Sequence, residues 1–440
     1  MAVSFCVSIK IFDCNSPKTL FLARFMHRLV LLSIFIISSL SATAQVAIEA
    51  FCVDTFAFIN CSKNQIALYD TAAWHLFFNK LDVCTRAETA SVSIVHIGDS
   101  HIQADFFSGE LRRALHKNFG NTPYSRGLIF PYAVAGTNNP FNYKVQWQGD
   151  WQCKKAIEKD CTELGVTGIS ITTTDTLNFL SIKLCDNNLL GYEGQYLQMF
   201  ADLGKNSFEP KILYPLGAEI VSVNRLEQSL IWDLKIYTDS VAIAFEKVKP
   251  EQQSFTLYGL NLFNSKSIEY HTIGINGARV SSYLRCSNFS NQLKALYPDL
   301  VIISLGTNDS YMAHFEGDTF YSQLEKMIAA IRTAQPNCAI LLTSPGQNKI
   351  AGKTSNQNTF AATNFMLKIA QNQRCAIWNF NAIMESPEMI DVWYEAGLMR
   401  SDFVHFTRKG YELQAHLLFN AIMQLKSNLQ QLNYQPNINE

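Results

Sequence analysis

The stretch VSIVHIGDSH, residues 92–101, decides how the rest of the chain is interpreted. Its apolar run from Val92 to Ile97 is typical of a buried strand, and the run stops at Gly98. Beyond Ser100 the apolar residues recur with helical spacing, at Phe106, Leu111, Leu115 and Phe119. The pattern predicts a strand, a tight turn and a helix that ends near Gly120, with Ser100 at the turn. Free backbone N–H groups and the helix dipole favour negative charge there, so the position suits a serine nucleophile.

The composition is that of a globular protein with a large core. The chain has 440 residues, of which 48% are hydrophobic and 17% charged, and we expect two domains. A formal charge of -1 and the absence of a basic cluster argue against a nucleic-acid partner. No CxxC or HExxH spacing occurs, so we expect no metal, and we expect no cofactor. We also expect a monomer, without a membrane span once the leader is removed.

Residues 1–44 have the pattern of a leader, with a secretory signal peptide over 26–44. A basic start at Met26-His27-Arg28 precedes an apolar stretch and a small-residue end at Ala44. The first 25 residues fit no part of such a signal, so translation is expected to begin at Met26. Removing residues 1–44 takes away four basic residues and one acidic residue and moves the formal charge from -1 to about -4. The signal predicts a secreted or periplasmic protein.

Nine of the eleven cysteines remain after the leader is removed, which is an odd number. An exported protein meets conditions that permit disulfides. Cys52 with Cys61, and Cys153 with Cys161, are close enough in sequence to pair. Scattered buried thiols are an equally good interpretation.

The chain divides into an α/β part, residues 45–140 and 271–427, and a β-rich segment, 141–270. An amphipathic piece over 67–81 indicates a helix in the first part. The β-rich segment contains short strand-like runs at 168–173, 176–184, 230–236, 241–245 and 254–260. We interpret it as an inserted all-β domain of the sandwich or jelly-roll type. Loops and hairpins that elaborate a single domain are the alternative.

Aromatic residues of this insertion could stack on sugar rings, although a Trp in a β-sandwich is more often part of the core. The candidates are Trp147, Trp151, Tyr192 and Trp232.

Strands and helices alternate after residue 271. Strands are predicted at 299–305, 339–343 and 376–380, and helices at 319–334, 359–370 and 409–425, followed by a flexible tail over 428–440. Such alternation implies a parallel sheet with right-handed crossovers, whose functional loops lie at the carboxyl ends of the strands. Ser100 and Asn308, in Gly306-Thr307-Asn308-Asp309, both fall at such ends.

The run Ser401-Asp402-Phe403-Val404-His405 supplies what a serine nucleophile lacks. A hydroxyl needs a base to take its proton, and the base needs a group that orients it. With a spacing of three, Asp402 can reach one ring nitrogen of His405 while the other faces Ser100. The Asn308 amide and the backbone N–H of Gly277 are candidate donors to an oxyanion.

These blocks, in this order, resemble those of the SGNH (GDSL-type) hydrolase family. The resemblance rests on Gly98-Asp99-Ser100, Gly277, Gly306-Thr307-Asn308-Asp309 and the Asp402/His405 pair. It implies a three-layer α/β/α fold, with Ser100 as nucleophile, His405 as base and Asp402 as the orienting carboxylate. It also implies an oxyanion hole made by the N–H groups of Ser100 and Gly277 and the Asn308 amide. Gly274 is an alternative to Gly277 in the same loop.

A narrower resemblance concerns Gly98-Asp99-Ser100-His101, Ala104-Asp105-Phe106-Phe107 and the early β-rich insertion. These features are similar to secreted peptidoglycan O-acetylesterases with a carbohydrate-binding-like β-domain. The resemblance implies a secreted serine esterase that removes acetyl groups from carbohydrate, with peptidoglycan as the leading substrate. An esterase acting on other acetylated polysaccharides or on lipids is an alternative. An acyltransferase and a non-hydrolytic carbohydrate-binding protein are further ones.

Several polar residues near these motifs have structural interpretations. Ser100 alone would suit a helix cap. His96 is expected in the core, and His101 either binds substrate or makes structural hydrogen bonds. Asp99 and Asp309 are expected to tie their turns together through backbone N–H groups. Pocket-lining residues could include Asn138, Arg279 and Thr307.

Overall fold

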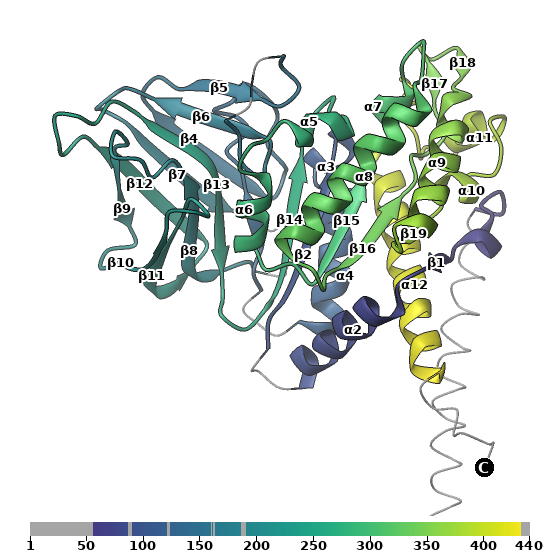
Figure 1. The fold of residues 1–440 in the computed structure, drawn as a ribbon, viewed down its shortest axis with the longest axis horizontal. Helices are drawn as coiled ribbons and strands as arrows, with labels where there is room; N and C mark the ends of the chain where they lie inside the picture. The colour runs from purple at the N-terminus through teal and green to yellow at the C-terminus, as the bar shows by residue number, and fades with distance from the viewer. Residues whose placement is uncertain are drawn as a thin grey trace, which may run out of the picture. The chain divides into compact units, whose positions relative to one another are not determined.

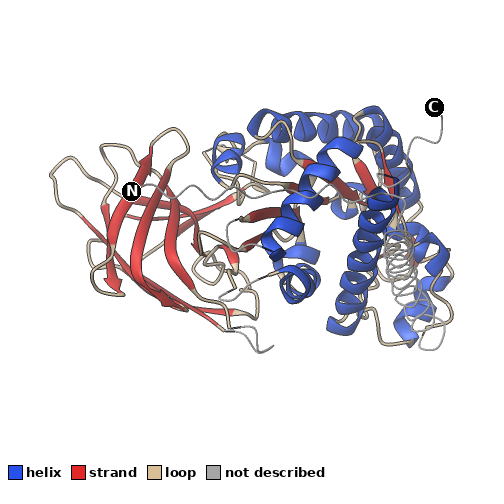
Figure 2. Ribbon diagram, turned by 90° about the horizontal axis from the view of Figure 1, so that it is seen from below, coloured by secondary structure: helices blue, strands red, loops and turns tan. Residues whose placement is uncertain are grey.

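The structure is a computed structural model that describes residues 56–86, 90–120, 124–159, 161, 163–185 and 191–432. The predicted leader, residues 1–44, and Cys52 lie outside the described residues. The described residues from Phe58 to Leu432 form one compact unit, with an α/β part and a region of antiparallel strands (Figures 1 and 2).

A mostly parallel six-stranded sheet is the centre of the α/β part. Its strands, in order across the sheet, are β1 (Ile66–Leu68), β19 (Ala376–Trp378), β16 (Ala339–Thr343), β15 (Leu300–Ser304), β2 (Val92–Gly98) and β14 (Ile268–Gly274). Only the edge strand β1 runs antiparallel to its neighbour. All seven residues of β2 are buried, as expected of a parallel strand covered on both faces. The strand predicted from the opening stretch is therefore confirmed.

Helices cover both faces of this sheet, which confirms the predicted α/β/α layers. Val95 and Ile97 of β2 share a core with α5 (Val280–Leu284), α6 (Phe289–Ala295), α8 (Gly317–Ala334) and α9 (Asn358–Asn372). On the other face α4 (Phe107–Phe119) packs against α2 (Thr71–Arg86) and α12 (Arg408–Leu432). Short elements complete this part: η1 (Cys61–Lys63), α7 (Thr307–Ser310), α10 (Phe380–Ile383), α11 (Met389–Glu395), β17 (Lys349–Ile350) and β18 (Thr354–Ser355).

The continuous helix predicted after Ser100 is wrong. The structure has a short helix α3 (Ser100–Gln103), and α4 begins only at Phe107. Between them Asp105 adopts a left-handed backbone conformation, with φ of 57°, which a continuous α-helix excludes. Its buried carboxylate receives hydrogen bonds from Arg112 and Arg126, so tertiary contacts override the helical pattern.

Two antiparallel sheets form the β-rich region. One has β10 (Glu219–Asn224), β11 (Ser229–Thr238), β8 (Gly194–Ala201), β13 (Phe255–Phe263), β6 (Ile169–Thr173) and β5 (Gln152–Lys155), with β3 (Gly127–Ile129) also on β13. The other has β4 (Tyr143–Gln148), β7 (Phe179–Leu184), β12 (Ser240–Glu246) and β9 (Glu209–Tyr214). Residues of both sheets share one core, among them Met199 and Leu257 of the first and Leu180 and Ile243 of the second. This is the sandwich arrangement expected for the insertion.

The boundaries of this region differ from residues 141 and 270, where the sequence places them. The strand β3, at 127–129, already pairs with β13 in the antiparallel sheet. The strand β14 begins at Ile268 and pairs in parallel with β2, with Tyr270 opposite Ile94. The two regions also share side chains of one core, because Leu128 and Phe200 pack in the cluster that contains Val95.

One further expectation differs from the structure. The final helix continues to Leu432, beyond the predicted start of the tail at 428, since Leu429 is buried and Lys426 pairs with Asp82 at 2.8 Å. For Cys153 and Cys161, of the two interpretations left open, the structure has the unpaired one, because both are free thiols.

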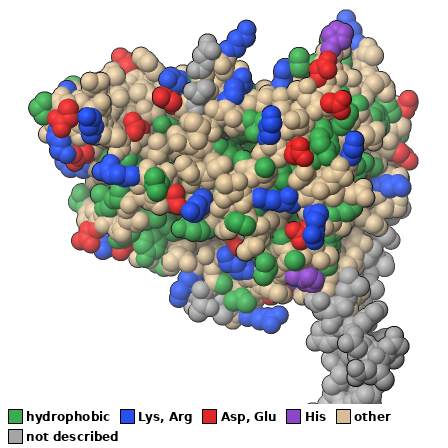
Figure 3. Space-filling model, viewed as in Figure 1, with side chains coloured by type: hydrophobic (Ala, Val, Ile, Leu, Met, Phe, Trp, Pro, Cys, Tyr) green, Lys and Arg blue, Asp and Glu red, His purple; other side chains and the backbone are tan. Residues whose placement is uncertain are grey.

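One face of the molecule, in Figure 3, carries Lys and Arg side chains interspersed with Asp and Glu. Hydrophobic side chains gather at its lower left, in the part of the view that holds the edge strand β10 and β11. In β10 the exposed fractions of Ile220, Val221 and Val223 are 54%, 55% and 51%. Among the described helices, none combines the length and the apolar character needed to cross a membrane.

Candidate active site

Ser100 stands where β2 ends and α3 begins. A Cβ at Gly98 would lie 2.8 Å from the backbone oxygen of Ser304, so only glycine allows this close approach of β2 to β15. Asp99 caps the turn, because its Oδ1 accepts a hydrogen bond of 3.0 Å from the His101 N–H. Ser100 is the first residue of α3, and the first N–H groups of a helix have no partner within it.

The structure brings Ser100, His405 and Asp402 together. The Ser100 Oγ lies 2.9 Å from His405 Nε2, and His405 Nδ1 lies 2.9 Å from Asp402 Oδ2. The expectation that Ser100 lies within hydrogen-bonding reach of His405 is therefore confirmed. Asp402 Oδ1 accepts two backbone hydrogen bonds, from Val404 and His405, each of 2.9 Å. An isolated bridge between Met399 and Phe406 closes this loop.

Hydrogen bonds keep the Asp402 carboxylate ionised. Partial burial tends to raise its pKa, but the hydrogen bonds from the backbone of His405 and Val404 and from the His405 ring outweigh this effect. The pKa of Asp402 is therefore lowered. An ionised carboxylate at Nδ1 favours the tautomer whose proton is on Nδ1, which leaves Nε2 free to accept the proton of Ser100.

The predicted oxyanion donors Gly277 and Asn308 line the same cleft but differ in their surroundings. Gly277 lines it, with φ of 79° and no heavy atom within 4 Å of a Cβ built there. The alternative, Gly274, instead lies against the backbone of α3. The Nδ2 group of Asn308 donates to Asp99 Oδ2 and to the Ala278 backbone oxygen, each at 3.0 Å. Both of its N–H bonds are thus engaged within the protein.

Asp99 and Asp309 hold the turns that carry these donors, as predicted. Burial raises the pKa of Asp99 to about 7, although hydrogen bonds from His101 and Asn308 act against it. Asp309 Oδ1 accepts a hydrogen bond of 3.2 Å from the Val280 N–H at the start of α5. Burial raises its pKa to about 6.

Two clefts flank the His405 ring. The larger, about 710 Å³, is lined by Ser100, Gly277, Asn308 and His405 and also by Asn138 and Thr307, two of the three expected pocket residues. The smaller, about 370 Å³, shares Asn308 and His405 and includes Asp402. Arg279, the third expected residue, is absent from the described lining of both.

His101 supports the His405 ring from behind. The two rings stack, with centroids 5.1 Å apart and an interplanar angle of 29°. His101 Nδ1 forms a hydrogen bond of 2.9 Å with the Tyr411 hydroxyl. Burial lowers the pKa of His101 to about 3, so the ring is neutral. Of the two interpretations of His101, the structural one is the one that these contacts favour.

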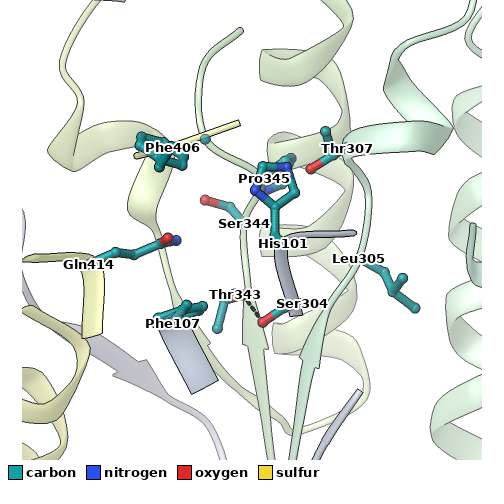
Figure 4. Close-up of a pocket in the computed structure, with 11 residues that line it drawn as sticks. His101, Phe107, Ser304, Leu305, Thr307, Thr343, Ser344, Pro345, Phe406 and Gln414 are labelled. Carbon is teal, nitrogen blue, oxygen red and sulfur yellow. Dashed lines mark hydrogen bonds between the residues drawn. The ribbon is translucent and has the colours of Figure 1, made fainter. Parts of the chain in front are cut away.

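A small cavity adjoins His101. Its volume is about 30 Å³, which is room for about one water molecule. Figure 4 shows His101, Ser344 and Gln414 around it, together with the hydrogen bond of 2.7 Å between the Ser304 and Thr343 hydroxyls. His101 Nε2 and Gln414 Oε1 are buried without a hydrogen-bond partner among the described residues.

Other candidates belong to the core. His96 is fully buried and its ring nitrogens bond the Tyr270 and Ser304 hydroxyls at 2.7 and 2.6 Å. Tyr192 and Trp232 are buried in the β-rich region, whereas Trp147 is 44% exposed. Within the described ranges, no group of three or more His, Cys, Asp or Glu side chains could hold a metal ion.

Sequence reasoning missed Tyr411 and two arginines of the larger cleft, Arg400 and Arg408. Arg408 and Tyr411 lie on α12, so their positions depend on how that helix packs, whereas Arg400 is held by the loop that carries Asp402 and His405.

Comparison with known proteins agrees with this geometry. Residues 256–413 match the GDSL-like Lipase/Acylhydrolase family. This range contains Gly277, Asn308, Asp402 and His405 but not Ser100, which lies before the β-rich region. No curated protein sequence matches the chain.

Among solved structures, a peptidoglycan O-acetylesterase is similar, with a TM-score of 0.67 and 20% identity over 82% of this chain and 99% of that one. A lipase/acylhydrolase from Enterococcus faecalis has a TM-score of 0.30 and 17% identity over 37% of this chain and 77% of its own. An acetyl xylan esterase, AlAXEase, has a TM-score of 0.29 and 20% identity over 35% and 81%. Residues 256–413 thus belong to the GDSL-like Lipase/Acylhydrolase family, and the chain shares its fold with a solved peptidoglycan O-acetylesterase.

Proposed function

We propose that this protein is a secreted or periplasmic serine esterase that removes O-acetyl groups from carbohydrate, with peptidoglycan as its leading substrate. The observation that carries the proposal is the chain of hydrogen bonds from Ser100 through His405 to Asp402 at the edge of an open cleft. The likeness to a peptidoglycan O-acetylesterase, which extends over 82% of the chain, and the leader pattern of residues 26–44 support the choice of substrate and compartment.

Ser100 Oγ attacks the ester carbonyl carbon while His405 Nε2 takes the hydroxyl proton. The negative charge moves to the carbonyl oxygen, where the N–H groups of Ser100 and Gly277 receive it. The carbon–oxygen bond to the sugar then breaks, and His405 returns the proton to the leaving sugar hydroxyl. An acetyl-Ser100 intermediate remains.

Water completes the cycle through the same groups. His405 removes a proton from water, the hydroxide adds to the acetyl carbonyl, and the bond to Ser100 Oγ breaks. Ser100 regains its proton from His405, and acetate leaves. Asn308 can act as the third oxyanion donor when one of its N–H bonds turns from Asp99 or Ala278 to the substrate oxygen.

The test is the acetate released from O-acetylated peptidoglycan and from acetylated xylan. We expect the wild type to release acetate, most readily from peptidoglycan, and the Ser100→Ala variant to lose this activity. Ser265→Ala is the matched control, because Ser265 is exposed between β13 and β14. Absence of acetate from both substrates with the folded wild type would contradict the esterase proposal. Preferential release from xylan would move the substrate to other polysaccharides.

A further inference from the structure

Two arginines, Arg400 and Arg408, line the cleft of about 710 Å³ beside the nucleophile. Apart from His405, the other described lining residues are apolar or neutral polar, and none is Asp or Glu. Asp402 borders the smaller cleft, and its carboxylate is held by His405 and by backbone N–H groups. The described lining of the larger cleft therefore contains two cationic side chains and no carboxylate.

The loop that carries the catalytic pair also positions Arg400. The bridge between Met399 and Phe406 brings the two ends of the loop together. Within it, the Arg400 backbone N–H donates a hydrogen bond of 2.8 Å to the His405 backbone oxygen. Arg400 thus stands opposite the base on the same loop, and Arg408 follows as the first residue of α12.

Arg408 is held by its surroundings but keeps unused donors. Its guanidinium lies 5.0 Å from the centre of the Phe141 ring and 5.7 Å from that of Phe106. Its Nε donates a hydrogen bond of 2.8 Å to Glu412. A guanidinium has five N–H bonds, so four remain for a ligand. The Arg400 side chain is exposed and has no ion pair with any residue that the structure describes.

We propose that Arg400 and Arg408 bind a carboxylate of the substrate, so that the enzyme prefers O-acetylated glycans that carry a carboxylate near the ester. This inference rests on the proposed esterase function. A guanidinium matches a carboxylate with two parallel hydrogen bonds, and a cleft of one sign of charge concentrates ligands of the opposite sign. A muramic acid unit carries such a group on its lactyl ether where no stem peptide is amide-linked to it, whereas the xylose backbone of xylan has none.

The test compares two forms of one O-acetylated muramoyl oligosaccharide. In one the lactyl carboxylate is free, and in the other it is a primary amide, so that only the charge differs. We expect kcat/KM of the wild type to be about tenfold higher for the carboxylate form, chiefly through a lower KM. The ratio should fall as ionic strength rises, because salt screens exposed charges.

Substitution identifies the residues responsible. Arg400→Gln and Arg408→Gln should each lower the carboxylate-to-amide ratio several-fold, and the double variant should bring it close to one. The Arg408→Lys variant should keep part of the preference because it keeps the charge. Arg86→Gln, which removes an exposed arginine at the end of α2, is the control and should leave the ratio unchanged.

The outcomes separate this inference from the proposed function. Equal kcat/KM of the wild type for both forms, with acetate released from each, would overturn the carboxylate site and leave the esterase intact. A ratio that persists in the double variant would also overturn the assignment to these two residues. Absence of acetate release from both forms would contradict the proposed function, and the inference with it.

Discussion

Asp402 accepts three hydrogen bonds, two from the backbone and one from the His405 ring, and each is 2.9 Å long. The two backbone bonds fix the position of the carboxylate, and the third bond fixes the orientation of the imidazole. The side chain of Asp402 is 48% exposed. Its effect on His405 therefore depends on the hydrogen-bond geometry more than on exclusion of water. In the proposed mechanism its role is thus to orient the base.

The substitution Asp402→Asn should lower kcat by about 10⁴-fold, because an amide that donates to Nδ1 stabilises the wrong tautomer of His405. The release of 4-nitrophenol from 4-nitrophenyl acetate measures this effect. Asp391→Asn, at an exposed carboxylate that pairs with Lys349, is the control. A loss of less than about tenfold would contradict the orienting role.

Tyr411 fixes the ring on which His405 rests. Its hydroxyl bonds His101 Nδ1 at 2.9 Å, and both side chains are buried or nearly so. The substitution Tyr411→Phe should reduce the free energy of unfolding by about 1–3 kcal/mol, because it leaves a buried ring nitrogen without a partner. Urea denaturation measures this change. Tyr394→Phe, at an exposed tyrosine, should stay within about 0.5 kcal/mol of the wild type.

The break between α3 and α4 is the element that joins the α/β part to the β-rich region. Asp105 lies there, fully buried, and its Oδ2 accepts from Arg112, Arg126 and Asn142. Because Arg126 precedes β3 and Asn142 precedes β4, one carboxylate connects the first helices with the start of the β-rich region. The apolar spacing of residues 106–119 predicts the helical face but contains no sign of this network. The helical pattern therefore predicts one helix where there are two.

The substitution Asp105→Asn should lower the free energy of unfolding by about 3–5 kcal/mol at pH 7, because it leaves two buried arginines without their counter-charge. Burial alone would raise the pKa of Asp105, but Arg112 and Arg126 outweigh it and hold the pKa below its usual range. The unfolded value is about 3.9. The ion pairs therefore stabilise the fold above that pH, and this contribution is lost as the pH falls through the lower folded value.

Thermal unfolding measured between pH 7 and pH 2 tests this sign. The wild type should lose stability on acidification, and the Asp105→Asn variant should lose less over the same range. An equal loss in both would show that other carboxylates account for the acid sensitivity.

Over the whole molecule, the sequence predicts the elements that have a local apolar pattern or a short motif. It does not predict the features that depend on contacts between residues far apart in the chain. Buried runs such as 92–97 predict the strands of the parallel sheet, and the four motif blocks predict the residues that meet at Ser100. The extension of α12 to Leu432 depends on Asp82, more than 340 residues away in sequence, and a scan of local pattern cannot detect it. For the same reason, local pattern does not predict that the Asn308 amide bonds Asp99, or that Arg400 and Arg408 line the cleft.

The chain passes from the β-rich region back to the parallel sheet between β13 and β14, and a titratable group, Glu269, lies on β14. Glu269 on β14 accepts a hydrogen bond of 2.8 Å from Asn261 on β13, so it links the two sheets. Burial raises the pKa of Glu269 to about 7, although the bond from Asn261 acts against this shift. The folded pKa thus lies above the unfolded value of about 4.3.

Glu269 favours the folded state fully only below the unfolded pKa, and this contribution is lost as the pH rises through about 7. We therefore expect Glu269→Gln, which keeps the shape and an acceptor for Asn261, to be more stable than the wild type at pH 8 by about 1–3 kcal/mol. At pH 4 the two proteins should be similar. Urea unfolding at both pH values measures the difference, with the exposed Glu395→Gln as control. A wild type as stable as the variant at pH 8 would mean that Glu269 stays ionised in the folded protein at no cost.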